Sequence, residues 1–171
     1  MRGASDALLD TYEAERRPAA QHVLALTTQV FEQDRVDKDR GFSRRGGETF
    51  QLGLGYRDSP LTRDCRDDLA DDALRAGDRA PDAPCGPIRL FDLVRGPHAT
   101  LFAFGGTDAP ASERFKPVRV GRPGEQGDVI DVDGHAHKGY GDRGLFLVRP
   151  DGYVALATED PADLASYEVF Y

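Results

Sequence analysis

The sequence predicts an α/β domain with a mixed sheet and flanking helices, preceded by a long N-terminal helical arm. Three patterns in its 171 residues support this prediction. Residues 99–104 form an uncharged apolar run that ends at a Gly-Gly pair, which is typical of a strand buried on both faces. Residues 145–148 and 153–157 flank Arg-Pro-Asp-Gly, a strong signal for a β-hairpin. Residues 8–31 carry apolar side chains at helical spacing.

The N-terminal part divides into an arm and a connector. The arm helix is expected over residues 5–31, with Ser5 and Asp6 as N-cap residues. Residues 34–47 mix charged residues and glycine without an apolar period, residues 49–56 suit a short strand, and residues 57–78 suit a loop with at most one helical turn. We therefore assign residues 1–33 to the arm, 34–78 to the connector and 79–171 to the domain.

Within the domain, the remaining elements are short. Residues 88–93 lead from a proline-rich approach into a turn, residues 115–120 and 129–132 are candidate strands, and Asp160 before Pro161 is placed to cap a last helix that runs to residue 167. Strands, a hairpin and a closing helix in this order indicate one α/β layer structure.

Composition excludes several classes of protein. The formal charge of −8 argues against a nucleic-acid partner, because such affinity rests on phosphate neutralisation by Lys and Arg. No apolar run approaches the roughly 20 residues of a membrane-spanning helix, and the sequence does not begin with an export signal. We expect a cytoplasmic protein without a membrane partner.

Residues 128–137 contain the densest group of potential metal ligands. The group consists of Asp128, Asp131, Asp133, His135 and His137, and the two histidines would share one side of an extended strand. The alternative interpretation is a turn at 133–134 that opens a short helix ending near residues 139–141. Because the calcium-loop pattern fails, we keep Asp133, His135 and His137 only as weak metal candidates and assign no metal site.

Other catalytic signatures are missing from the sequence. Cys65 and Cys85 are too few and too far apart for a disulfide framework or a zinc site, so two reduced thiols are expected. No Gly-x-Gly-x-x-Gly joins a strand to a helix, and no Gly-x-Ser-x-Gly occurs. We assign no catalytic residue and no cofactor-binding residue to this chain.

Two stretches resemble a known family. Residues 2–18, RGASDALLDTYEAERRP, are similar to the end of the catalytic part of FAD-dependent aromatic-ring hydroxylases, the para-hydroxybenzoate hydroxylase-like monooxygenases. Residues 77–82, 89–98 and 147–154 resemble the thioredoxin-like C-terminal domain that a subset of these enzymes carries. The resemblance implies FAD and NAD(P)H for a full-length family member, whose flavin-binding motifs would precede this sequence.

The resemblance also implies the role of the domain. Thioredoxins carry Cys-x-x-Cys after a core strand, where a helix N-terminus lowers a thiol pKa. The sequence here reads Gly-Gly-Thr-Asp at residues 105–108, so dithiol redox chemistry is not expected. We therefore interpret the chain as the non-catalytic C-terminal portion of an aromatic hydroxylase, inactive alone, with a role in interdomain packing or oligomerisation.

The partner is expected to contact the arm through apolar side chains. The residues concerned are Leu8, Tyr12, Val23 and Leu24, and they would face a flavoprotein catalytic domain or a second copy of the chain. One alternative is a free-standing module that dimerises or docks on a separately encoded hydroxylase. Another is a small redox or metal enzyme, which would need chemistry at Cys85 or at His135 and His137.

Overall fold

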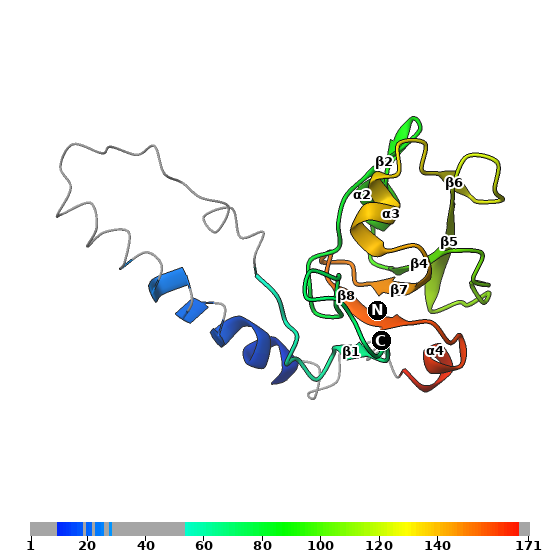
Figure 1. Ribbon diagram of the computed structural model, residues 1–171. Coiled ribbons are helices and arrows are strands. Elements are labelled where there is room, and N and C mark those ends of the chain that lie inside the picture. Colours follow the sequence, from blue (N-terminus) through cyan, green and yellow to red (C-terminus); the bar gives the residue numbers. More distant parts are fainter. Residues whose placement is uncertain (1–9, 19, 22, 26–27, 29–53, 168–171) are drawn as a thin grey trace, which may run out of the picture. The chain divides into compact units, whose positions relative to one another are not determined.

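The computed structural model of the protein describes residues 10–18, 20–21, 23–25, 28 and 54–167 (Figure 1). The chain divides into two compact units, one of residues 1–54 with 170–171 and one of residues 55–169. All described residues of the arm from 10 to 28 are helical, as the apolar spacing predicts. Within this helix Arg17 lies 3.8 Å from Glu13, and the Arg16 guanidinium lies 5.5 Å from the ring centre of Tyr12.

The second unit is built on one six-stranded sheet of order β1-β8-β7-β4-β5-β6. Its strands are β1 (Arg63–Asp64), β4 (Ala99–Phe104), β5 (Phe115–Gly121), β6 (Val129–Ile130), β7 (Gly144–Val148) and β8 (Val154–Thr158). Neighbours β4, β5 and β6 run parallel, as do β1 and β8, whereas β7 is antiparallel to both β4 and β8. The predicted mixed sheet is therefore confirmed. A separate hairpin joins β2 (Pro84–Cys85) to β3 (Ile88–Arg89).

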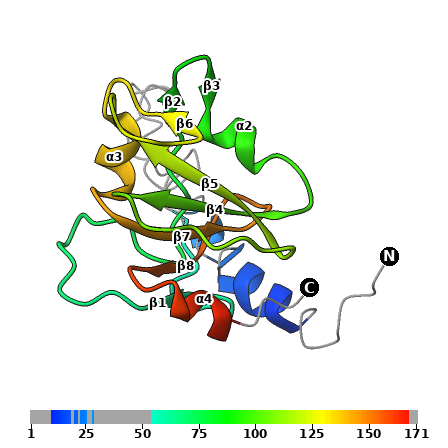
Figure 2. The same cartoon turned by 90° about the vertical axis from the view of Figure 1, so that its right-hand side faces the viewer.

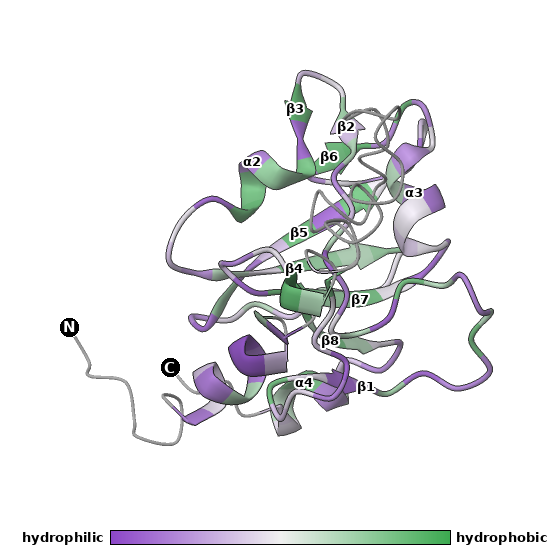
Figure 3. Cartoon of the chain, turned by 90° about the vertical axis from the view of Figure 1, so that its left-hand side faces the viewer, coloured by the Kyte–Doolittle hydropathy of each residue, from purple (hydrophilic) through white to green (hydrophobic). Residues whose placement is uncertain are grey.

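Short helices cover both faces of this sheet (Figure 2). On one face α2 (Leu90–Val94) and α3 (His135–Tyr140) pack on a buried cluster that includes Phe102, Phe104 and Phe146. On the other face α4 (Ala162–Ser166) packs through Leu164 on a cluster that includes Leu101, Leu145 and Leu147. Strands β4, β7 and β8 are buried along their whole length, and Figure 3 colours much of the central sheet as apolar.

The central strand order β8-β7-β4-β5 is that of a thioredoxin-like sheet, with one parallel pair and one antiparallel hairpin. One element of that fold is absent between β4 and β5. Residues 105–114 contain turns and irregular backbone but no helix. The parallel crossover is therefore made by a loop rather than by the usual helix.

The hairpin predicted around Arg-Pro-Asp-Gly is confirmed. Gly152 adopts a positive φ of 86°, the backbone conformation that favours glycine, and its N–H donates to the carbonyl of Arg149 at 2.9 Å. The Arg149 N–H donates to the carbonyl of Tyr153 at 2.8 Å, which closes the turn between β7 and β8. The buried strand at 99–104 and the strand at 115–120 are also confirmed, as β4 and β5.

Residues 55–78, which the sequence analysis places in the connector, belong to the compact unit of the domain. Within this segment β1 pairs with β8, and Asp64 receives the Arg66 guanidinium at 2.8 and 3.0 Å and the N–H of Ala76 at 2.9 Å. Residues 54–56 are not in a strand, and the rest of the strand expected at 49–56 lies outside the described residues. Residues 88–93 divide between β3 and α2. None of the described helices has the length and apolar character needed to cross a bilayer.

Candidate functional site

A buried carboxylate and a buried imidazole meet where β6 passes into α3. Asp131 directly follows β6, and His137 lies in the middle of α3. Oδ2 of Asp131 lies 2.8 Å from Nδ1 of His137 and accepts the backbone N–H of the same residue at 2.9 Å. The intervening turn contains Gly134 at a φ of 73°, where an added Cβ would meet nothing within 4 Å. Backbone geometry, rather than space, therefore favours glycine at this position.

Hydrogen bonding favours the ionised form of the Asp131 carboxylate. Burial by itself would raise the pKa of Asp131, but hydrogen bonds from His137 and from the backbone N–H of Ala136 lower that pKa below its usual value. An ionised carboxylate only accepts hydrogen bonds, so the proton between the two groups belongs to Nδ1 of His137. When the imidazole is neutral, Nε2 carries an acceptor lone pair.

Two polar atoms of the pair have no partner among the described residues. Oδ1 of Asp131 and Nε2 of His137 are both buried and make no hydrogen bond. The side chains that carry them are 0% and 4% exposed. Buried polar groups in proteins nearly always have a hydrogen-bond partner, so these two atoms are unusual and can accept hydrogen bonds from a donor.

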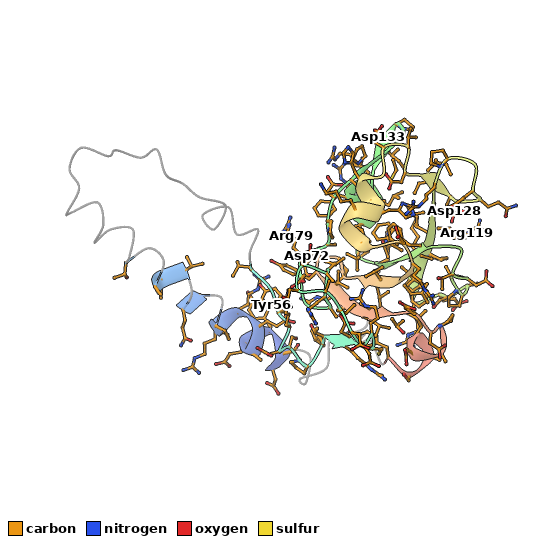
Figure 4. All side chains as sticks on the ribbon, in the orientation of Figure 1. Tyr56, Asp72, Arg79, Arg119, Asp128 and Asp133 are labelled. Atoms are coloured by element: carbon orange, nitrogen blue, oxygen red, sulfur yellow. The ribbon has the colours of Figure 1, made fainter. Side chains whose placement is uncertain are left out.

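A cleft of about 480 Å³ adjoins the pair. Its lining includes Asp131, His137, Arg122, Val132, Asp133 and Lys138. Figure 4 labels Asp133, which is exposed on the turn before α3. Val132 beside it is 59% exposed, so the turn forms an accessible rim above two buried acceptors.

Aromatic rings enclose the inner side of the site. The ring of Phe104 lies edge-to-face with His137 at 5.1 Å and stacks on Tyr140 at 4.9 Å. The hydroxyl of Tyr140 donates to the carbonyl of Pro81 at 3.0 Å, and burial raises the pKa of this phenol far above its usual value. Tyr140 is therefore a neutral structural group rather than an acid or base.

The metal-ligand candidates do not assemble into a metal centre among the described residues, where no group of three His, Cys, Asp or Glu side chains could hold an ion. His135 and His137 lie in a helix instead of an extended strand, so His135 is exposed while His137 is buried. Asp128 pairs with Arg119 at 3.0 Å. The pattern of residues 128–137 indicates Asp131 and His137 as candidate ligands but does not reveal their direct contact. The only sequence signal for that contact is a carboxylate six residues before a histidine across a Gly turn.

Comparison with known proteins identifies the family. A profile described as "Aromatic-ring hydroxylase, C-terminal" matches residues 74–168. The chain belongs to this family. A flavin-dependent monooxygenase of Mycobacteroides abscessus is 37% identical to it, and the match covers 96% of this chain and 31% of that protein. Pentachlorophenol 4-monooxygenase of Sphingobium chlorophenolicum is 35% identical, with coverages of 92% and 35%.

A solved structure confirms the fold of this aromatic-ring hydroxylase C-terminal region. The crystal structure of aklavinone-11 hydroxylase in a ternary complex with FAD and aklavinone superposes with a TM-score of 0.65 at 29% identity. The superposition covers 92% of this chain and 32% of that one. The chain thus spans about a third of the length of the relatives that it matches.

The cysteines of this hydroxylase C-terminal region are not placed for redox chemistry. Cys85 is buried beside β3, and its burial together with the nearby carboxylates of Asp131 and Asp82 raises its pKa to about 11. Burial and Asp163 also raise the pKa of Cys65. Neither residue lies at the end of β4, where thioredoxins place their dithiol, and both are free thiols.

The predicted interface residues lie on the arm. Tyr12 is 64% exposed, Leu24 is 67% exposed and Val23 is 37% exposed, whereas Leu8 lies outside the described residues. In the described part of the domain, the one other large exposed apolar side chain is Val132. Among the described residues, the large exposed apolar side chains are therefore concentrated on the helical arm.

Proposed function

We propose that this chain is the C-terminal part of an FAD-dependent aromatic hydroxylase, in which its thioredoxin-like domain has a structural rather than a catalytic role. The observation that carries the proposal is the end of β4. There, residues 105–108 replace the dithiol with Gly-Gly-Thr-Asp, and no helix follows to activate a thiol. The domain has kept the sheet of a thioredoxin without its reactive centre.

The described residues do not fit FAD. Flavin-binding folds place the pyrophosphate at a helix N-terminus that follows a strand and a glycine-rich turn. The loop after β4 contains glycines but leads into no helix, and α2, α3 and α4 are 5 or 6 residues long. FAD and NAD(P)H therefore belong to the part of a hydroxylase that the relatives contain and this chain does not span.

The arm is the element proposed to contact that part. Its described residues expose Tyr12 and Leu24, and burying each large side chain of this kind contributes about 1.5–3 kcal/mol. Residues 2–18 resemble the end of the catalytic part of the hydroxylases, so a flavoprotein catalytic domain is the proposed partner. A second copy of the chain is the alternative partner, and it corresponds to a free-standing dimerisation module.

Flavin binding and native mass test the proposal together. The purified chain is incubated with FAD, desalted and examined by absorbance, alone and after mixing with the separately expressed catalytic part of a relative. We expect no flavin on the chain alone and a one-to-one complex with the catalytic part. Retention of stoichiometric flavin by the chain alone would contradict the proposal. A stable homodimer that does not bind the catalytic part would support the free-standing dimerisation module.

A further inference from the structure

The cleft beside Asp131 and His137 adjoins two buried atoms that can accept hydrogen bonds. Its two buried unpartnered atoms, Oδ1 of Asp131 and Nε2 of His137, are both acceptors when the carboxylate is ionised and the imidazole is neutral. Leaving a buried polar group unsatisfied is unfavourable, so binding of a group with two donors is favoured here. This observation is independent of the role proposed for the domain.

The charge around the cleft favours a cation. The guanidinium of Arg122 is paired with the carboxylate of Asp142, and the backbone N–H of Arg122 donates to Glu125 at 2.8 Å. The other charged residues of the lining are the carboxylates of Asp131 and Asp133 against the single ammonium of Lys138. The whole chain has a formal charge of −8, which attracts a basic partner at longer range.

We propose that this cleft binds a guanidinium or primary ammonium group carried by an arginine or lysine side chain of a partner polypeptide. The charged head donates to Oδ1 of Asp131 and to Nε2 of His137, with Asp133 at the rim. The exposed side chain of Val132 lies where the methylene stem of such a residue would pass. Because the two acceptors are covered in the free protein, access of the charged head to them requires a local rearrangement of the site.

Other ligand classes fit less well. An anion would face the two carboxylates of Asp131 and Asp133 with only the ammonium of Lys138 to offset them, because Arg122 is already paired with Asp142. A divalent metal ion needs about three protein ligands, and the described residues offer no such group of His, Cys, Asp and Glu. A neutral amide can donate hydrogen bonds to the two acceptors, but it carries no positive charge to pair with the carboxylates of the lining.

Titration of the full chain followed by NMR tests the proposal. The probes are N-acetyl-arginine methylamide, its uncharged isostere N-acetyl-citrulline methylamide, and N-acetyl-glutamate methylamide. We expect the arginine probe to shift the imidazole signals of His137 and the amide signals of residues 131–138, with affinity that falls as salt rises. The citrulline probe should bind about tenfold more weakly and the glutamate probe should produce no shift.

Substitutions at two lining positions test the site, and the exposed position Asp133 separates binding from folding. Asp131→Asn should abolish the response, and Asp133→Asn, at an exposed position, should weaken it about threefold without changing the melting temperature. Asp108→Asn, an acidic position outside the cleft lining, serves as the matched control and should bind as the parent does. Equal shifts with the arginine and glutamate probes, shifts located elsewhere on the chain, or an unaltered response in Asp133→Asn would overturn the proposal.

Discussion

Oδ2 of Asp131 holds His137 at two points, 2.8 Å from Nδ1 and 2.9 Å from the backbone nitrogen. A single carboxylate oxygen therefore fixes both the imidazole ring and the backbone of α3 at His137. The buried residues Ala136 and Tyr140 of α3 pack in the apolar core of the sheet. The contact between Asp131 and His137 therefore connects the end of edge strand β6 to this core. The pair therefore stabilises the connection between β6 and α3 and also lines the cleft.

Replacement of Asp131 by Asn should destabilise the domain. The substitution keeps the size of the side chain but removes the charge that receives two hydrogen bonds, and bonds to a charged group contribute about 1.5–3 kcal/mol. We expect a loss of about 2 kcal/mol in the free energy of unfolding, measured by urea denaturation with an unchanged slope. The exposed neighbour Asp133, changed to Asn, should shift stability by less than about 0.5 kcal/mol. Equal effects of the two substitutions would contradict the structural role of Asp131.

Stability should fall in acid because several carboxyl groups have lowered pKa values. Burial disfavours ionisation of Asp64 and Asp131, but hydrogen bonds outweigh it, and the hydrogen bond from Arg119 lowers the pKa of Asp128. Each folded pKa lies below the ordinary value of 3.8. The stabilisation is therefore complete above that value and is lost as pH falls through the folded pKa. Urea unfolding at pH 7, 5, 4 and 3 should show little change down to pH 5 and a steep decline below pH 4, with a shallower decline in Asp131→Asn.

Arg66 should contribute more to the stability of the domain than an exposed arginine such as Arg63. Its guanidinium is bidentate to Asp64, donates to the carbonyl of Leu74 at 2.6 Å and lies 5.0 Å from the ring centre of Phe146. Lysine cannot reproduce this planar arrangement, so Arg66→Lys should cost about 1.5 kcal/mol of unfolding free energy.

A matched substitution separates this geometry from the loss of any arginine. Arg63 is half exposed and lies 3.9 Å from Asp163, and exposed ion pairs contribute little. Arg63→Lys should therefore change stability by less than about 0.5 kcal/mol. If both lysine variants unfold at the same urea concentration, the contacts of the Arg66 guanidinium do not stabilise the segment of residues 55–78.

Native Cys85 should resist thiol reagents. With a pKa of about 11, about one molecule in a thousand carries the reactive thiolate at pH 8, and the side chain is 2% exposed. Titration with a chromogenic disulfide should label Cys85 slowly in the native protein and rapidly in urea. A Cys65→Ser variant isolates the Cys85 signal. Rapid labelling of that variant under native conditions would contradict a buried, inert thiol.

The sequence predicts the centre of the sheet because its signals are local. Strand β4 is an uninterrupted apolar run, and the β7–β8 hairpin has its turn residues between two such runs. The segment 57–78 lacks such a pattern. Its order comes from contacts distant in sequence, such as the pairing of Arg63 with Leu156, which no periodicity reveals. Similarly, Asp131 and His137 could be selected as polar candidates, but their contact depends on how the turn at Gly134 directs α3.

The outer edge of β5 is closed to further strands. N–H groups alternate sides along a strand, and Arg119 turns its N–H and carbonyl outward to Asp128, at 2.8 and 2.9 Å. Residue 117, two positions earlier, faces the same way and is proline, which has no N–H to offer. The pairing of β5 with β6 begins only at Val120, so this proline protects the part of the edge that β6 leaves uncovered among the described residues.

Pro117→Val should therefore promote association of the chain. The substitution restores an outward N–H and adds a residue with high strand propensity, so it opens the edge to another molecule while leaving the pairing with β4 intact. Size-exclusion chromatography across a concentration series should show dimers or larger species that the parent lacks. Lys116→Val adds comparable apolar surface on the same strand, but its N–H faces β4, so it controls for hydrophobicity alone. If Lys116→Val associates as strongly as Pro117→Val, apolar surface rather than the free edge drives association, and the protective role of Pro117 is wrong.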